Sequence, residues 1–522
     1  MADSKLARGS FFILIGNVIF RIGGYLYRFL MAKLLGPAMY GILGLTLPFQ
    51  GIFQILAAGG LPPAIAKYVA EYNATDQKNL ARQTILTSLK IMIILGLVMG
   101  FLMIFLIAPW LANDIFHNPN ALLPLEAVGL ITPFSVIVGA FRGAFQAVYK
   151  MEYIVATRAV EQIFMILCAT AFVLIGLQAF GAVLGSVVGF FASSISGVYI
   201  YKKYMGEYIQ KTEDPNWVFT KKDELKLAKQ LVLFSIPVTI TAIAEMVIFS
   251  ISTLIMGVFL SDSLIGYYTA ADPIARLPLI VSTSIATTIL PAASAAYSTK
   301  NKKQLDNYVF KSYEYSLLLT APLCIFTAIF SKSIMRIVYF TNPAYTSGAL
   351  ALSILVLGMT FYSIYAVSNS IIQGIGYPRI SMYILLCGSG LNAILNWFLI
   401  QEYGIAGGAL ATTLATFILM IPTVYITFRV TKAKIQHGKI MKVIFASLIM
   451  GLAILFIPNN PYGLVLGIVV SPIVYILALV ILKIFETEDI EQMKNLQNKL
   501  GPLKGVYLKI VRFIEENGIS KN

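Results

Sequence analysis

Charged residues are scarce in this 522-residue sequence, at only 12% of the chain, whereas an average soluble protein has about 25%. Hydrophobic residues make up 58%. A chain of this length with half the usual charge could not cover its own surface in water. The composition therefore predicts an integral membrane protein and excludes a disordered or collagen-like chain.

Cysteine and histidine are also rare, with 3 and 2 residues respectively. Cys168, Cys324 and Cys387 all lie in apolar stretches, which argues against a disulfide framework. His117 and His437 are far apart in the sequence and cannot form a metal site by themselves. No Gly-x4-Gly-Lys-Ser/Thr loop occurs, so we do not expect the chain to hydrolyse ATP. We expect no metal and no cofactor.

Long apolar stretches, by contrast, are abundant. A helix needs about 20 mainly apolar residues to cross a hydrocarbon core roughly 30 Å thick, and about fourteen segments meet that criterion. The predicted fold is an all-α integral membrane protein with about 14 transmembrane helices. The predicted spans are residues 11–35, 40–68, 83–111, 122–148, 153–177, 181–201, 231–260, 266–297, 308–330, 348–373, 380–399, 404–428, 440–457 and 462–484.

Lysine and arginine are concentrated in alternate connections between these spans. Connections 110–121, 178–180, 261–265 and 458–461 contain neither residue, and Lys332 and Arg336 are the exception to the alternation. Because cytoplasmic loops are enriched in basic residues, we predict a multi-pass protein of the cell membrane with both termini in the cytoplasm. The net charge of +15 then indicates contact with anionic membrane lipids, and no nucleic acid is expected.

The sequence also contains an internal repeat. Residues 61–68 and 290–297 both read Leu-Pro-x-Ala-x-Ala-x-Tyr, and the spacing of Gly41 and Pro48 recurs in Gly266 and Pro273. The repeating unit has six spans, an even number, so its two copies enter the membrane from the same side as parallel repeats. We therefore expect two six-helix lobes around a central cavity.

The repeat predicts five regions along the chain. The N-lobe covers residues 1–204, a cytoplasmic linker residues 205–229 and the C-lobe residues 230–430. Two extra transmembrane helices follow in residues 431–485. Residues 486–522 have apolar positions at roughly helical spacing among lysines, which predicts a cytoplasmic amphipathic tail at the membrane surface.

Two stretches resemble a known family. Residues 21–28, Arg-Ile-Gly-Gly-Tyr-Leu-Tyr-Arg, followed by Leu-Leu-Gly-Pro at 34–37, resemble the first span of polysaccharide-biosynthesis flippases. These include the stage V sporulation protein B group and the O-antigen flippases of the multidrug/oligosaccharidyl-lipid/polysaccharide exporter superfamily. Residues 267–272, Tyr-Tyr-Thr-Ala-Ala-Asp, resemble the family's eighth span. The resemblance implies that lipid-linked sugars are flipped from the cytoplasmic to the outer leaflet. Lipid II members have an arginine directly after this aspartate, whereas Pro273 follows here, which argues against a lipid II substrate.

Charges inside a predicted span mark a candidate substrate path, because each costs about 2.5 to 3.5 kcal/mol near the bilayer centre. Arg21 lies about 15 Å into the first span, and Arg28 lies two turns later on nearly the same face. Gly24 leaves room between them, so the two guanidinium groups could bind a pyrophosphate. Alternatively, Arg28 extends to the outer interface and Arg21 pairs with a carboxylate.

Asp272 and Arg276 are four residues apart in the eighth predicted span and share a face. They form either a self-neutralising pair or a substrate-binding site in which Asp272 tunes Arg276. Their equivalents in the first repeat are Leu47 and Gly51. Charges that break the repeat are better candidates for function than positions that obey it.

Glu161 and Glu245 are acidic residues within predicted spans. Each is either a coupling site for a sodium ion or a proton, or a charge partner of an arginine such as Arg21 or Arg142. The partner role is the preferred interpretation.

The leading hypothesis is a transporter that flips a lipid-linked oligosaccharide or a polyprenyl-phosphate-linked sugar by alternating access, for cell-surface polysaccharide biosynthesis. The alternative is a cation-coupled multidrug exporter, although the first span has two arginines and no acid to attract a drug cation. A membrane glycosyltransferase or polymerase needs acidic residues on outer loops, which offer only isolated ones such as Asp114, Asp262 and Glu402. We therefore predict no enzymatic activity, a lipid-linked sugar as substrate and a monomeric protein.

Overall fold

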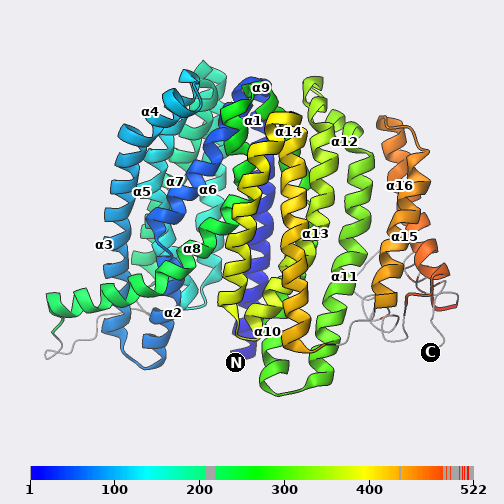
Figure 1. The fold of residues 1–522 in the computed structure, drawn as a ribbon. Coiled ribbons are helices and arrows are strands. Elements are labelled where there is room, and N and C mark those ends of the chain that lie inside the picture. Colours follow the sequence, from blue (N-terminus) through cyan, green and yellow to red (C-terminus); the bar gives the residue numbers. More distant parts are fainter. Residues whose placement is uncertain are drawn as a thin grey trace. The chain divides into compact units, whose positions relative to one another are not determined.

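The structure is a computed structural model. It describes the backbone of residues 2–205, 218–433 and 437–485, with a few isolated residues between 490 and 516. Side chains are described from residue 22 onward in these ranges, except at residues 74 and 437. The elements of this described part are all helices (Figure 1). They are α1 (Ala2–Ala58), α2 (Leu61–Ala74), α3 (Lys78–Leu102), α4 (Ala108–Trp110), α5 (Leu122–Ala147), α6 (Met151–Phe172), α7 (Gln178–Tyr204), α8 (Lys221–Phe259), α9 (Asp262–Ala275), α10 (Leu279–Ser298), α11 (Lys302–Ile329), α12 (Ser331–Val338), α13 (Ala349–Gly374), α14 (Pro378–Thr431), α15 (His437–Leu455) and α16 (Pro461–Ile481), with short 3-10 or π-helical turns between some of them.

Eleven described segments are long and apolar enough to cross a membrane. Three of them, Ile22–Asn73, Met151–Tyr204 and Pro378–Thr431, have 52 to 54 residues. At 1.5 Å per residue each is about 80 Å long, more than twice the hydrocarbon thickness. The all-helical membrane architecture is confirmed. The count of fourteen requires each long segment to cross twice and stays a prediction.

The three long segments are each interrupted by a glycine with left-handed backbone. The φ angles are 69° at Gly36, 96° at Gly176 and 56° at Gly404. Only glycine adopts such angles at little cost, so it can break a helix without an intervening loop. Gly36 falls between two predicted spans, Gly176 is the second-last residue of the predicted span 153–177, and Gly404 is the first residue of the predicted span 404–428.

The predicted eighth span, residues 266–297, is wrong as a single helix. α9 ends at Ala275, and residues 276–278 form a turn before α10 begins at Leu279. The cause is local: Pro273 and Pro278 lack the backbone N–H that a continuous helix requires. The predicted second span is also interrupted, at Gly59 and Gly60, where φ is 55° and 67°. The two repeats therefore break at different positions.

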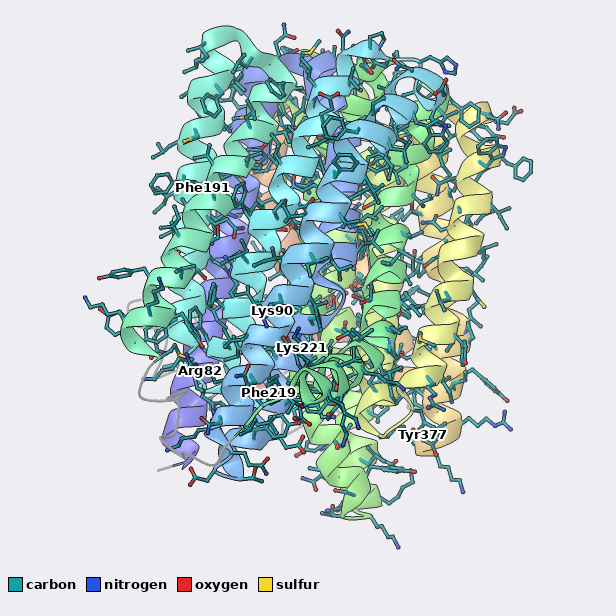
Figure 2. The ribbon with its side chains drawn as sticks, turned by 90° about the vertical axis from the view of Figure 1, so that its left-hand side faces the viewer. Arg82, Lys90, Phe191, Phe219, Lys221 and Tyr377 are labelled. Atoms are coloured by element: carbon teal, nitrogen blue, oxygen red, sulfur yellow. The ribbon has the colours of Figure 1, made fainter. Side chains whose placement is uncertain are left out.

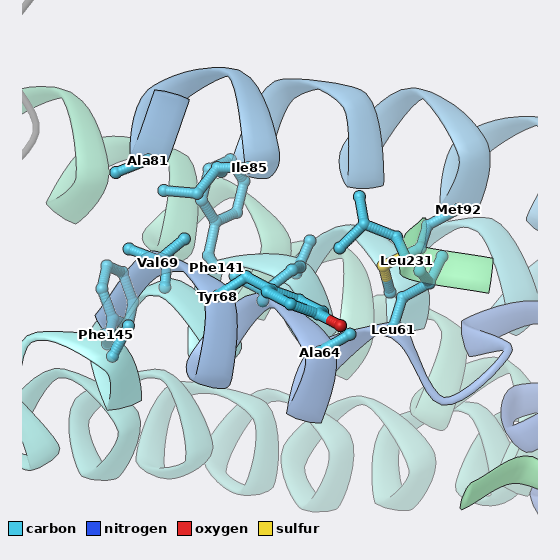
Figure 3. Close-up of a cluster of buried hydrophobic side chains, with 14 of the residues drawn as sticks. Leu61, Ala64, Tyr68, Val69, Ala81, Ile85, Met92, Phe141, Phe145 and Leu231 are labelled. Atoms are coloured by element: carbon cyan, nitrogen blue, oxygen red, sulfur yellow. The ribbon is translucent and has the colours of Figure 1, made fainter. Parts of the chain in front are cut away.

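The helices divide into two compact units, residues 1–270 and 271–522. The boundary between the two units, after residue 270, lies well beyond the predicted linker at 205–229. The reason is that α8, predicted to begin the C-lobe, packs against α1, α2 and α3 of the first unit. The predicted lobe boundaries stay a prediction, and linker residues 206–217 lie outside the described part of the chain. The core of the first unit joins α2, α3, α5 and α8 through side chains such as Leu61, Ile85, Phe141 and Leu231 (Figure 3).

In the second unit, α13 packs against α10, α11 and α14, and α15 packs against α11 and α16. Most of the predicted amphipathic tail, residues 486–522, lies outside the described residues. The described tail residues Ile490, Val511 and Ile514 are buried in a cluster with α15 and α16. At these three positions the apolar face of the tail contacts the protein itself.

Candidate functional site

One face of α1 is open at the position where the sequence predicts a phosphate site. A Cβ atom placed on Gly24 would meet no atom of the described side chains and neighbouring helices within 4 Å. Arg28, one turn further along, is half-buried. The backbone of Arg21 lies in α1, but its side chain is outside the described part of the structure. No atom of a described side chain or neighbouring helix lies within 4 Å of this Cβ position, and both the pyrophosphate site and the binding role of the arginines stay predictions.

The adjacent face of α1, with Gly23 and Tyr27, is packed against α6 and α7. A Cβ atom on Gly23 would lie 2.6 Å from the side-chain oxygen of Gln162, so this glycine allows close approach of the two helices. The buried Tyr27 hydroxyl donates a hydrogen bond of 3.0 Å to the carbonyl oxygen of Ala182. These contacts set the rotation of α1 about its axis and so determine which of its residues face open space.

A buried ion pair connects α5, α6 and α7 in the same unit. Arg142 Nη2 donates to Glu161 Oε2 at 2.7 Å and to Ser193 Oγ at 3.1 Å, while its Nε donates to Thr157 Oγ1 at 3.1 Å. The side chains of Arg142 and Glu161 are 17% and 4% exposed. Of the two roles considered for Glu161, the geometry is that of a charge partner for Arg142.

Arg158 adds a second guanidinium to this cluster, and our sequence reasoning missed it. It is half-buried on α6, three residues before Glu161, and lies close enough for the charges of Arg142 and Glu161 to act on it. The available signal was a basic residue inside the predicted span 153–177.

Asp272 and Arg276 form an ion pair in the second unit. Arg276 Nη2 donates to Asp272 Oδ1, and the backbone N–H of Arg276 donates to the Asp272 carbonyl oxygen at 3.2 Å. The Asp272 side chain is 11% exposed and that of Arg276 is 27% exposed. The self-neutralising arrangement is therefore present, at the point where α9 gives way to the turn before α10. A substrate-binding role for the pair stays a prediction.

Glu245 on α8 differs from the other acidic candidates. Its side chain is exposed, and it makes no hydrogen bond or ion pair with the described residues. The next residue, Met246, packs against Gly51 of α1, which fixes the orientation of α8 at this level. Among the described residues, no group of three or more His, Cys, Asp or Glu side chains could hold a metal ion.

A second buried acid that our sequence reasoning missed is Glu314 on α11. It lies 3.4 Å from the Lys311 ammonium group and 3.0 Å from that of Lys439 on α15. All three side chains are at most 13% exposed. The cluster ties the first of the two extra helices to α11.

At the other end of the first unit, α1 and α9 meet through repeat-related glycines. A Cβ atom on Gly41 would lie 2.9 Å from the amide nitrogen of Gly266 and closer still to the Asp262 carbonyl oxygen. The Asn118 amide donates to both carboxylate oxygens of Asp262, at 2.7 and 2.9 Å. Desolvation raises the pKa of Asp262 above its usual range, against the opposing effect of the Asn118 hydrogen bond. This junction has no room for a side chain at Gly41.

An open cavity of about 650 Å³ lies near the start of α8 in the first unit. It is lined by the α2–α3 connection and by α8, including Tyr72, Phe219 and two pairs of opposite charge. Near the start of α8, Glu224 accepts a hydrogen bond from Lys90 of α3 at 2.6 Å; Figure 2 labels Lys90 together with Phe219 and Lys221. Because acidic and basic lining residues balance, this cavity is less suited to a phosphate than the open face of α1.

These features define an all-helical, multi-pass membrane protein with ion pairs buried inside its helical units. The chain belongs to the polysaccharide biosynthesis protein family, whose family model matches residues 6–297, more than half of the chain. The MatE family model matches residues 237–398. The family resemblance predicted from the sequence is confirmed.

Several curated proteins are similar over most of the chain. An uncharacterised membrane protein of Methanocaldococcus jannaschii is 29% identical over 432 residues, which is 82% of this chain and 99% of that protein. Stage V sporulation protein B of Bacillus subtilis is 24% identical over 434 residues, 79% of this chain and 81% of its own. Lipid II flippase MurJ of Bacillus subtilis is 23% identical over 440 residues, 79% of this chain and 80% of its own.

Two solved structures show the same fold. Lipid II flippase MurJ in an inward closed conformation matches with a TM-score of 0.72 at 18% identity, covering 89% of this chain and 97% of that one. An inward-facing multidrug resistance MATE family transporter matches with a TM-score of 0.64 at 17% identity, covering 79% and 94%. At these identities the likeness supports the fold alone.

Proposed function

We propose that this protein is a flippase that moves a lipid-linked oligosaccharide, or a polyprenyl-phosphate-linked sugar, across the cell membrane for cell-surface polysaccharide biosynthesis. Membership of the polysaccharide biosynthesis protein family supports this function. So do relatives named as flippases, such as the lipid II flippase of Bacillus subtilis and a probable glycan biosynthesis flippase of Haloferax volcanii. The observation that carries the proposal is the open face of α1 between Arg21 and Arg28.

The chemistry of that face suits a phosphorylated headgroup. Guanidinium groups bind phosphate oxygens through paired, charge-assisted hydrogen bonds, which are stronger away from bulk water. Arg21 and Arg28 supply the positive charge in the first unit, and Gly24 leaves space for the ligand. In the second unit, Arg276 is the candidate phosphate contact, and Asp272 holds its guanidinium in place until a headgroup competes for it. The protein acts by alternating access and has no catalytic residue.

Direction requires a source of free energy, and Glu245 is the candidate coupling residue. A carboxylate inside an apolar span without a basic partner is stable when it is protonated or binds a cation. Protonation or sodium binding at Glu245 would couple the flip to an ion gradient. We further propose that the protein acts as a monomer with both termini in the cytoplasm, since basic connections alternate with uncharged ones.

The test is reconstitution in liposomes with a fluorescent lipid-linked sugar, whose transfer is followed by quenching of the outer leaflet. Arg21→Ala and Arg28→Ala should each slow transfer at least tenfold, the size expected when one charged hydrogen bond is lost. Arg82→Ala, on the cytoplasmic part of α3, removes the same charge elsewhere and is the matched control. Transfer by both α1 variants at the parental rate would show that these arginines are structural.

A cation-coupled multidrug exporter is the second candidate, supported by the MatE model match over residues 237–398. The same liposomes loaded with a fluorescent drug cation distinguish the two functions. Uptake driven by an imposed ion gradient and lost in Glu245→Gln, with no transfer of the lipid-linked sugar, would favour the exporter. The two arginines and the lack of acids in the first span argue against binding a cation there.

A further inference from the structure

We propose that Lys67 of α2 binds the phosphate group of a lipid at the predicted cytoplasmic side of the first unit. The inference deepens the proposed flippase function and rests on it for one point, that a lipid-linked substrate meets Lys67 before it reaches the arginines of α1. Three observations support it. Two aromatic rings hold the Lys67 ammonium group, no acid neutralises it, and the second copy of the repeat has no lysine at the equivalent position.

Two aromatic rings fix the position of the Lys67 side chain. Its ammonium nitrogen lies 4.8 Å from the centre of the Tyr68 ring and 4.7 Å from that of Phe234 on α8. The two rings pack edge to face with their centroids 5.7 Å apart, and Tyr68 belongs to the buried cluster of the first unit (Figure 3). Because a cation is attracted to the negative face of an aromatic ring, the lysine is held in one place before any ligand arrives.

The charge of Lys67 remains available to an anion. Its side chain is exposed, and it makes no ion pair with Glu71, four residues later in α2, or with any other described acid. By contrast, the guanidinium group of Arg142 is buried against Glu161. An aromatic ring attracts an ammonium group without cancelling its charge, and a lysine has three N–H donors. Lys67 can therefore donate to a phosphate oxygen while it stays over the rings.

Lys67 also breaks the internal repeat. Residues 61–68 correspond to residues 290–297, so the equivalent of Lys67 is Ala296. Ala296 is 2% exposed, which shows that this position of the second copy is packed. The lysine is therefore not required by the architecture that the two copies share. A charge present in only one copy is a candidate for function.

The depth of Lys67 suits the phosphates of the cytoplasmic leaflet. α2 ends at Ala74, and the connection that follows is predicted to be cytoplasmic. Lys67 precedes that end by seven residues, or about 10 Å along the helix axis. The headgroup region of one leaflet is about 5–8 Å thick, so Lys67 lies near the level where lipid phosphates adjoin hydrocarbon. A lysine at this depth can extend its ammonium group to the phosphates.

A binding assay separates this role from a structural one. The probes are farnesyl pyrophosphate, dioctanoyl phosphatidylglycerol and uncharged farnesol, with affinity measured from the thermal stabilisation of the detergent-solubilised full chain. Lys67→Met keeps an apolar side chain over the rings and removes the charge. It should weaken the binding of at least one phosphate probe about tenfold, as expected for one lost charged hydrogen bond, and leave farnesol binding unchanged. Lys67→Arg keeps the charge and should recover most of the affinity.

Lys203 of α7 provides the matched control. Its ammonium nitrogen also lies over two rings, 5.4 Å from the centre of Tyr199 and 5.3 Å from that of Tyr204, and it donates to the Tyr199 hydroxyl oxygen at 3.0 Å. It belongs to the last turn of α7, where a positive charge stabilises the helix C-terminus. Lys203→Met should therefore bind all three probes with the affinity of the parent.

The outcomes identify the source of the phosphate. A loss for farnesyl pyrophosphate alone assigns the headgroup of the transported lipid, whereas a loss that includes phosphatidylglycerol assigns a membrane phospholipid. Absence of phosphate binding by the parent would overturn the inference, and so would parental affinity for both phosphate probes in Lys67→Met. An equal loss in Lys203→Met, or for farnesol, would also overturn it, because the effect would then come from general surface charge or from damage to the fold.

The same variants distinguish this inference from the proposed function. If the parent binds a phosphate probe through Lys67 but does not transfer a lipid-linked sugar in liposomes, the binding site stands and the flippase function fails. If the parent transfers the sugar and Lys67→Met binds both phosphate probes like the parent, the function stands and the inference fails.

Discussion

Removal of Glu161 should destabilise the first unit more than removal of almost any other single polar side chain. Its carboxylate is 4% exposed and is the acid bonded to Arg142, which is itself only 17% exposed. In Glu161→Leu, the Arg142 guanidinium keeps only the hydroxyl acceptors of Thr157 and Ser193. An uncompensated buried charge of this kind costs about 3–5 kcal/mol.

Two companion variants resolve the origin of that loss. Glu161→Gln keeps an acceptor for Arg142 but removes the negative charge, so its cost should be smaller, about 1–3 kcal/mol. Adding Arg142→Met to Glu161→Leu removes the stranded cation as well. This double variant should recover most of the stability, because an apolar pair of similar volume can replace a buried ion pair.

Reversible unfolding in detergent, followed by circular dichroism against denaturant, measures these differences. The matched control is Lys150 with Glu152, an ion pair at the start of α6 that is 3.6 Å long and about one-third exposed. Its disruption should change stability by less than about 1 kcal/mol. The reasoning would be refuted if Glu161→Leu were as stable as the parent, or if the double variant were less stable than either single one.

Three further predictions concern other parts of the chain. Gly41→Ala should destabilise the protein by about 1–3 kcal/mol, because the added Cβ has no room at the α1–α9 junction. Gly390 of α14 has space for a Cβ, so Gly390→Ala should be neutral or stabilising when thermal melting of the two variants is compared. Glu314→Gln should lower the melting temperature and detach α15 from α11, because Lys311 and Lys439 lose their buried acidic partner. Detachment would be measured as faster proteolysis of the C-terminal helices. An unchanged cleavage pattern would show that Glu314 does not hold α15 in place. Asp262 has a raised pKa, so the stability that its protonation provides is present at low pH and is lost as the pH rises through that pKa. The melting temperature of Asp262→Asn relative to the parent should therefore increase between about pH 4 and pH 7, and a constant difference would contradict the assignment.

The parts of the fold that follow from local rules were predictable from the sequence. Apolar length alone indicated an all-helical membrane protein, and the glycines with positive φ that break the three long segments lie at or within two residues of predicted span ends. The i,i+4 spacing of Asp272 and Arg276 correctly suggested that they can pair. The turn after Arg276 was not anticipated, because helical periodicity continues through residues 276–278 and only the two flanking prolines indicate a break.

The parts of the site that depend on contacts between distant residues were not predictable. Glu314 lies in a predicted span, but its partner Lys439 belongs to a helix far along the chain. Similarly, Arg142 of α5 contacts Ser193 of α7, which is 51 residues away in the sequence. Periodicity shows which residues of one helix share a face, but it does not show which neighbouring helix that face meets.

The glycine breaks at Gly36, Gly176 and Gly404 have a practical consequence for labelling the protein. At each, one helix folds directly into the next, so there is almost no free backbone for an antibody, a protease or an inserted tag to engage. Epitopes placed there would disturb two neighbouring helices at once. Surface labels should instead be introduced as single side chains next to these corners.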